Sequence, residues 1–191
     1  GDGNGKNITG FHIRLGIDTT FVEGGSHMAI ILFRYSEALL AYEEAAEELN
    51  LCNDDVLNKT LKPLRERAGV TYIRPTQIDP NFTSFGYSLT PVMQEIRRER
   101  RAELAFQGFR QDDLMRWAGH KLIKGQRGLG AYLGTDGGLY TNDSGWMDPL
   151  KDYLPQGYQF QPDRDYLLPI PPDELELNKQ LKQNPGWTKT K

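Results

Sequence analysis

Two adjacent carboxylates, Asp112 and Asp113, are the first residues that could perform chemistry. General acid and base catalysis requires two such groups converging on one cleft, whereas neighbouring residues on a helix point in different directions. The histidines His12, His27 and His120 are far apart in sequence and lack the HxxxH or His-Cys spacing of a metal site. The sequence therefore predicts a protein that is not an enzyme and that uses no cofactor or metal.

Region 119–165 combines nine Gly with six aromatic residues and has no sustained period. It contains the Gly-rich stretch 125–138, which lacks the preceding strand and following helix of a phosphate-binding turn. A long ordered loop is predicted, and loops of this kind often carry function. Its aromatic side chains could pin the loop to the body or form platforms for sugar rings. Trp146 and Tyr140, beside flexible and polar residues, are the candidate ligand-binding residues.

The segment 95–106 is a dense run of Glu and Arg on a predicted helix. The interleaved carboxylates argue against a nucleic-acid patch. Helical spacing puts Glu99, Arg100 and Glu103 at the border of the apolar stripe. We expect these three side chains to be buried and paired, in a network that fixes how helices dock, so that Glu103→Ala costs about 3 kcal/mol or more of stability.

The elements that position these residues are mainly helical. Apolar residues at helical spacing predict helices over 32–49, 54–68, 91–107 and 111–123, with a kink at Pro63, little strand and irregular loops over 125–165. On the first helix the apolar positions are Tyr35, Leu39, Tyr42, Ala46 and Leu49, and most Glu residues fall elsewhere. The short turn between the first two helices predicts an antiparallel hairpin of the tetratricopeptide type.

Composition narrows the function classes. The 191 residues carry 23 Lys and Arg against 26 Asp and Glu, a net charge of -3, which offers no basic field for nucleic acid or anionic lipid. The single Cys52 excludes a disulfide scaffold. The longest apolar run, 28–33, is far shorter than the ~20 residues of a membrane-spanning helix. A single domain over residues 1–191 is predicted.

Three segments together resemble the C-terminal region of the SusD/RagB family of outer-membrane nutrient-binding lipoproteins of Bacteroidetes. The first is the helix 32–45 (LFRYSEALLAYEEA), with a partner helix ending in RERAG at 65–69. The second is 96–110 (IRRERRAELAFQGFR), continued by DDLMRW at 112–117. The third is the pair YLLPIP at 166–171 and LKQNPGW at 181–187. Gln107 departs from the family, which commonly has Glu there.

The resemblance implies a non-catalytic protein on the extracellular face of the outer membrane. Such a protein binds oligosaccharide or polysaccharide nutrients and passes them to a TonB-dependent, SusC-like transporter. The matched motifs are scaffold motifs and do not identify the glycan. The alternative is a helical protein-interaction scaffold that touches no sugar.

Family members are generally about twice this length, and the resemblance implies that an N-terminal repeat half is absent from this polypeptide. The lipid anchor would be a Cys outside the chain, because Cys52 lies between helices. One face of the 32–68 hairpin would then lack its stacking neighbour. We expect an association to cover the exposed apolar surface, with the N-terminal half of the same protein as a partner.

Overall fold

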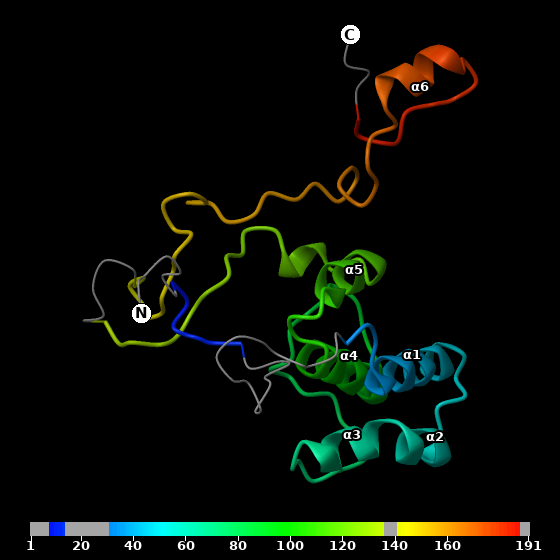
Figure 1. Ribbon diagram of the computed structural model, residues 1–191, viewed down its shortest axis with the longest axis vertical. Coiled ribbons are helices and arrows are strands. Elements are labelled where there is room, and N and C mark those ends of the chain that lie inside the picture. The colour runs from blue at the N-terminus through cyan, green and yellow to red at the C-terminus, as the bar shows by residue number, and fades with distance from the viewer. Residues whose placement is uncertain (1–7, 14–30, 136–140, 188–191) are drawn as a thin grey trace, which may run out of the picture. The chain divides into compact units, whose positions relative to one another are not determined.

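The computed structural model describes residues 8–13, 31–135 and 141–187. These residues form a mainly helical structure, as the sequence predicts, and contain isolated β-bridges but no strand (Figure 1). The helices are α1 (Tyr35–Glu48), α2 (Asp54–Lys59), α3 (Leu61–Arg67), α4 (Pro91–Glu103), α5 (Phe109–Arg116), a 3-10 helix η1 (His120–Leu122) and α6 (Pro172–Leu177). All four predicted helical segments contain helix, with changed ends, and two of the four are divided. None of these helices is long and apolar enough to cross a bilayer.

The chain forms two compact units. The helical unit comprises Ile13–Thr83 and Tyr87–Asp112, and so holds α1 to α4. The loop unit comprises Gly1–His12, Ser84–Gly86 and Asp113–Lys191. The chain passes from one unit to the other within α5.

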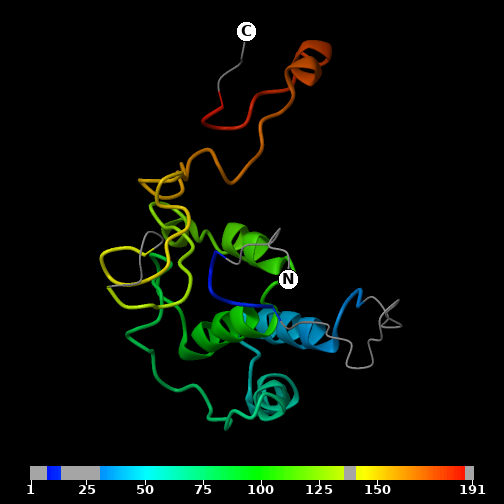
Figure 2. The same ribbon diagram turned by 60° about the vertical axis from the view of Figure 1, so that its left-hand side comes forward.

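The helical unit is built around α1, which contacts α2, α3 and α4. In both views α2 and α3 lie on the same side of α1 and α4 (Figures 1 and 2). Two clusters of buried apolar side chains form the core of the helical unit. One joins Leu57 and Leu61 to Val92 and Ile96, and the other contains Leu40, Leu64 and Leu104. Helical spacing predicts that residues 56, 57, 61, 64 and 68 share the inward face. The first four are buried, whereas Ala68 at the end of α3 is exposed.

The orientation of α1 differs from the expected one. Glu43 and Glu44 are buried at 0% and 4% exposure, while Tyr35, Tyr42 and Leu49 of the apolar stripe are exposed. The inward face is set by the neighbours of the helix, since Leu40 joins the core and Glu44 faces Arg100 on α4. Amphipathic spacing identifies the stripe, but it does not determine which face the surrounding helices cover.

The expected helix over 54–68 is two helices that meet at Thr60, three residues before the expected kink. Pro63 still provides the physical reason. It has no N–H for the carbonyl of Lys59 four residues earlier, and its ring would crowd that carbonyl. The chain therefore leaves helical geometry at Thr60 (φ -117°, ψ -81°). Pro63 then lies in the first turn of α3, where backbone N–H groups have no acceptor within the helix, so the missing N–H breaks no helical hydrogen bond.

The helix α4 begins as predicted, with the Thr90 side chain accepting a bond from the Met93 N–H and with Pro91 in the first turn. It ends at Glu103, four residues before the expected end at residue 107. The Glu103 carbonyl accepts hydrogen bonds from the Arg34 guanidinium (2.6 Å) and the Gln107 side-chain amide (3.0 Å). Side chains thus replace the backbone donors that a longer helix would supply.

The expected helix over 111–123 is also divided. Ala118 has a left-handed backbone (φ 49°), and the N–H groups of Gly119 and Ala118 donate backwards to the carbonyls of Leu114 and Met115 at 2.7 and 3.1 Å. These two hydrogen bonds form a C-terminal cap, which ends α5. Only the single turn of η1 follows it.

The predicted ion-pair network is confirmed. Glu99 bonds Arg65 at 3.1 Å, Arg100 faces Glu44 at 3.6 Å, and the side chains of Arg100 and Glu44 are 7% and 5% exposed. The Glu103 side chain, 8% exposed, pairs with Arg34 at 2.9 Å and Arg67 at 2.5 Å.

The arginine partners of Glu103 are less buried than expected, at 24% for Arg34 and 58% for Arg67. Solvent can therefore hydrate both cations after Glu103→Ala. This exposure lowers the expected cost of Glu103→Ala from about 3 kcal/mol to about 1–2 kcal/mol.

Trp187 anchors the C-terminal segment. Its ring N–H donates to the Leu167 carbonyl at 2.9 Å, and the Arg164 guanidinium lies 4.7 Å from its ring centroid. The Gln183 side-chain amide bonds both the N–H and the carbonyl of Ile170, at 2.8 and 2.9 Å. These contacts close the loop that carries α6.

Candidate functional site

The candidate site lies in the loop unit, where three segments join by backbone hydrogen bonds. The N–H of Gly130 donates to the Met147 carbonyl at 2.7 Å, and Met147 returns a bond to Ala131 at 2.9 Å. Ala131 also donates to the Thr9 carbonyl at 2.8 Å, which joins a third segment. Residues 129–133 are thus held between residues 8–11 and 142–147. The arrangement resembles a short ladder, although no strand is formed in the described residues.

Glycine is required at two points of this ladder. A Cβ on Gly130 would come within 2.4 Å of the Thr9 carbonyl oxygen and 2.9 Å of the Met147 Cβ. Gly145 has φ +83°, and a Cβ there would lie 2.8 Å from the ring of Tyr132. The glycines therefore permit close approach of the segments and seat one aromatic ring against backbone.

Tyr132 and Trp146 form an aromatic pair at the centre of the ladder. They are antiparallel bridge partners, so their side chains lie on the same face. Their ring centroids are 5.2 Å apart and their planes meet at 62°. Both rings keep open surface, since Tyr132 is 60% and Trp146 42% exposed. We call Tyr132 and Trp146 the aromatic corner. Two rings in this arrangement can contact the C–H face of a sugar ring, while water or side chains bond the hydroxyl groups of the sugar.

A tight turn at 142–146 holds Trp146 in place. The Asn142 side-chain oxygen accepts bonds from the N–H groups of Ser144 and Trp146, both at 3.0 Å, and the Asn142 N–H donates to the Trp146 carbonyl at 2.8 Å. Asp143 and Ser144 at the tip are exposed. Their side chains are the polar groups closest in sequence to the aromatic corner.

An arginine clasp fixes the loop that follows. Arg127 bonds both carboxylate oxygens of Asp148, with the shortest contact at 2.6 Å, and donates to the carbonyls of Leu154 and Pro155 at 3.0 Å. Asp148 is 1% exposed. The Arg127 guanidinium holds the pKa of Asp148 below its usual range, although burial opposes this shift. The charged pair therefore gives the loop beside the aromatic corner a fixed path.

Of the two residues that the sequence suggests for ligand binding, the structure describes only Trp146. Trp146 lies in the corner, and its partner is Tyr132, which the sequence analysis did not single out. Tyr140 lies outside the described residues. The Tyr132 and Trp146 pairing is a tertiary contact between positions 14 residues apart, and the sequence holds no local signal for it.

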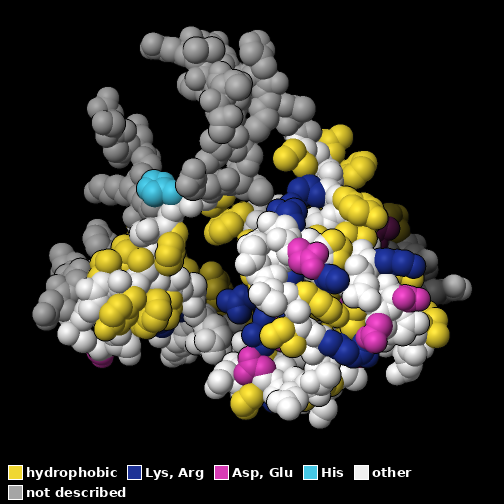
Figure 3. Space-filling model, turned by 90° about the horizontal axis from the view of Figure 1, so that it is seen from below, with side chains coloured by type: hydrophobic (Ala, Val, Ile, Leu, Met, Phe, Trp, Pro, Cys, Tyr) yellow, Lys and Arg dark blue, Asp and Glu magenta, His cyan; other side chains and the backbone are white. Residues whose placement is uncertain are grey.

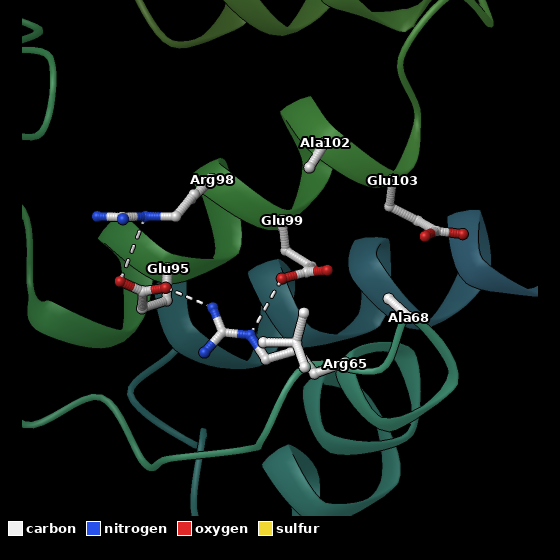
Figure 4. Close-up of a pocket in the computed structure, with 8 residues that line it drawn as sticks. Arg65, Ala68, Glu95, Arg98, Glu99, Ala102 and Glu103 are labelled. Atoms are coloured by element: carbon white, nitrogen blue, oxygen red, sulfur yellow. Dashed lines mark hydrogen bonds and ion pairs between the residues drawn. The ribbon is translucent and has the colours of Figure 1, made fainter.

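A second concave feature lies in the helical unit, between α3 and α4 (Figure 4). It has a volume of about 470 Å³ and is lined by Ala68, Val70 and Ala102 together with charged side chains. Arg65 projects between Glu95 and Glu99 and bonds them at 2.5 and 3.1 Å. None of the described residues that line this groove is aromatic, so it offers no ring for a sugar to stack on.

The residues considered for catalysis are not brought together. Asp112 is exposed, whereas Asp113 is 3% exposed and bonds Arg116 at 2.7 Å. The His120 ring lies 2.9 Å from the Tyr166 hydroxyl. Among the described residues, no group of three or more His, Cys, Asp or Glu could hold a metal ion. On the face shown in Figure 3, positive and negative side chains are interspersed, which offers no single-sign surface there.

Comparison with known proteins gives one match. The family model described as "SusD family" matches residues 2–187, nearly the whole chain. No curated protein and no solved structure matches.

Proposed function

The chain belongs to the SusD family, and from that membership we propose that it binds oligosaccharide or polysaccharide nutrients at the bacterial cell surface without catalysing a reaction on them. We further propose that it works on the extracellular face of the outer membrane and delivers the glycan to a TonB-dependent, SusC-like transporter. The N-terminal half of a longer polypeptide is proposed as its second protein partner. Membership in the family is what supports these finer proposals.

The aromatic corner of Tyr132 and Trp146 is the observation that supports glycan binding by this chain. Two half-exposed rings on one face provide apolar contact area at little cost in side-chain entropy. The Gly145 seat, the Asn142 turn and the Arg127 clasp hold the corner before a ligand arrives. Preorganisation of this kind reduces the entropic cost of binding.

Weak binding would suffice for this role. A millimolar dissociation constant corresponds to only about -4 kcal/mol, and a transporter held beside the protein compensates through a high effective concentration. A shallow corner of two rings is consistent with such an affinity.

The test is a glycan array probed with the chain, followed by titration of any glycan that binds. Trp146→Ala should weaken binding roughly tenfold, because it removes the larger ring. Tyr153→Ala is the matched control, since Tyr153 is an exposed aromatic residue (83%) of the same unit outside the corner.

The intrinsic fluorescence gives a second readout. Trp146 is 42% exposed and Trp117 is 3% exposed, so a bound sugar should change the emission of Trp146, and Trp146→Phe should abolish this response. Equal loss of affinity in the Trp146 and Tyr153 variants would contradict the assignment of the corner. Failure of the chain to bind any glycan would favour the alternative function, a helical protein-interaction scaffold.

A further inference from the structure

Residues 8–11, which belong to the loop unit, cross the ladder next to the aromatic corner. We call this segment the strap. Its Thr9 carbonyl accepts a hydrogen bond from the Ala131 N–H at 2.8 Å. Ala131 directly precedes Tyr132 in the sequence. The strap is therefore docked on the backbone beside one ring of the corner.

Glycines on both sides permit this close approach. Gly10 of the strap has φ +74°, and a Cβ there would lie 2.8 Å from the Ala131 Cβ and 3.1 Å from the Met147 Sδ. Carbon atoms in van der Waals contact are about 3.5–4.0 Å apart, so there is no room for a side chain at position 10. On the ladder, a Cβ on Gly130 would overlap with the Thr9 carbonyl oxygen. The strap and the ladder therefore meet backbone to backbone.

The strap lies against both segments that carry the corner. Ala131 directly precedes Tyr132, and Met147 directly follows Trp146. The Met147 N–H donates to the Ala131 carbonyl at 2.9 Å, and Tyr132 and Trp146 are bridge partners. A displacement of Gly10 therefore acts on the backbone next to both rings.

The pairing of two short segments needs a third segment to be stable. Segments 129–133 and 142–147 are joined by short-range backbone bonds such as the one from the Leu133 N–H to the Gly145 carbonyl at 2.8 Å. A two-stranded pairing of this kind is at best marginally stable in water, and further packed segments are needed to keep it formed. The strap supplies a third segment, through one backbone hydrogen bond and close packing.

We propose that the strap is a positioning element for the aromatic corner, and that its docking against Ala131 and Met147 keeps Tyr132 and Trp146 in the arrangement that receives a sugar ring. The strap acts through these two residues and needs no contact with the sugar. Its consequence for glycan affinity rests on the proposed function, whereas its effect on the ladder does not. Because coupling is reciprocal, a bound sugar also holds the strap in place.

Gly10→Ala in the 191-residue chain tests the docking, because the new Cβ would overlap with Ala131 and force the strap away. Gly125→Ala is the matched control. Gly125 lies in the same unit and has nearly the same backbone angle (φ +73°), but nothing lies within 4 Å of its Cβ position. The two variants therefore share the backbone strain of a left-handed alanine and differ in the overlap.

Hydrogen exchange measured by mass spectrometry reports the state of segment 142–147. Amides of this segment bond to residues outside the strap, since Met147 donates to Ala131 and Gly145 to Asn142. Faster exchange there shows that the corner has loosened, and not merely that a bond to the strap is lost. Gly10→Ala should speed this exchange roughly tenfold, and Gly125→Ala should leave it near the wild-type rate. Unchanged exchange in α1 and α4 shows that both variants remain folded.

Ala131→Gly provides a rescue, because it removes the Cβ that the side chain of Gly10→Ala would meet. The double variant should return to the exchange rate of Gly125→Ala, since only the backbone strain at position 10 remains. If Gly10→Ala acted through its backbone strain alone, the second change would restore nothing. Ala131→Gly alone is measured in parallel.

Cellohexaose, maltohexaose, xylohexaose and mannohexaose serve as neutral sugar probes, titrated against the emission of Trp146. Gly10→Ala should weaken binding of any probe that the wild type binds by roughly fivefold or more, because the corner is no longer preorganised. Gly125→Ala should bind as the wild type does. A bound probe should also slow amide exchange of residues 8–13 in the wild type.

Several results would overturn the proposal even where sugars bind. They are unchanged exchange of segment 142–147 in Gly10→Ala, equal changes in Gly10→Ala and Gly125→Ala, and no recovery in the double variant. Faster exchange with undiminished affinity would also overturn it, because the strap would then hold the loop without serving the site. If the wild type binds none of the four probes, the result counts against the proposed function, and the exchange rates still decide whether the strap holds the corner.

Discussion

Replacing Glu43 with Gln should remove a pH dependence of stability that originates in one buried carboxyl group. Glu43 is 0% exposed, and neither of its carboxylate oxygens has a hydrogen-bond partner among the described residues. Burial raises its pKa from 4.5 to about 7. The Thr60 side chain acts in the opposite direction, but its hydroxyl already donates to the Val56 carbonyl at 2.8 Å. A carboxylate in this position is therefore poorly solvated.

Charged groups from the surrounding elements partly cancel one another. Glu99 on α4 and Glu47 on α1 raise the pKa of Glu43, whereas Arg65 on α3 lowers it. Arg65 is itself bonded to Glu95 and Glu99, so it gives Glu43 little net compensation. Desolvation remains the dominant cause.

The sign of the effect follows from linkage. The folded state holds the Glu43 proton more tightly than the unfolded state, so the wild-type free energy of unfolding should fall as pH rises from 4.5 to about 7. Below that window both states are protonated, and above it both are ionised. A shift of this size corresponds to about 3 kcal/mol at most. Glu43→Gln cannot ionise and should lack this decline, so it should be more stable than wild type at about pH 8.

Urea unfolding followed by far-UV circular dichroism between about pH 5 and pH 8 measures the difference between wild type and Glu43→Gln. Fluorescence is recorded in parallel, because the three tryptophans, at 117, 146 and 187, all lie in the loop unit. Glu48→Gln removes an exposed carboxylate of the same helix and is the matched control. A wild-type-to-variant difference that is equal at both ends of the pH range would refute the reasoning.

Three further changes test other parts of the structure. Glu44→Ala should destabilise the helical unit by about 3 kcal/mol in urea unfolding, because it removes the buried carboxylate that faces the buried Arg100 cation at 3.6 Å; a loss below about 1 kcal/mol would contradict this. Burial and nearby carboxylates raise the pKa of Cys52 to about 11, so its alkylation at about pH 8, followed by mass spectrometry, should be roughly a hundredfold slower than that of a free thiol, and an ordinary rate would show an open site. Arg127 lowers the pKa of Asp148, so their clasp should be stable above the usual Asp range and be lost as pH falls through the lowered value. Asp148→Asn should weaken the clasp at neutral pH and speed limited proteolysis of residues 149–156 roughly fivefold or more, and unchanged cleavage would exclude a role in holding the loop.

Much of the helical unit could be predicted because its signals are local. The Thr90 cap followed by Pro91 determines where α4 begins, whatever the rest of the chain does. The border positions of Glu99, Arg100 and Glu103 follow from helical spacing, and their burial and pairing are confirmed. The positions of helix ends were less predictable. The early end of α4 depends on Arg34, which is 69 residues away from Glu103 in sequence.

The candidate site was only partly accessible to sequence reasoning. The glycine and aromatic content predicts a long irregular loop, and Trp146, one of the two candidates for ligand binding, is partly exposed in it. Tyr132 became a partner only through the ladder, whose hydrogen bonds connect residues distant in the chain. Such pairings depend on where the whole loop folds back, so they cannot be predicted from the spacing of neighbouring residues.

The family, the mainly helical class and the apolar stripe on α1 can all be predicted from the sequence, because family motifs, helical periodicity and capping residues are properties of neighbouring positions. The packing of the helices leaves Tyr35, Tyr42 and Leu49 of this stripe exposed, while it buries Ala46 together with Glu43 and Glu44. A helix has one periodicity but several faces, and the face that becomes buried is selected by the helices packed against it. In α1, contacts with α2, α3 and α4 draw Leu40 and two carboxylates inward and leave the tyrosines outside.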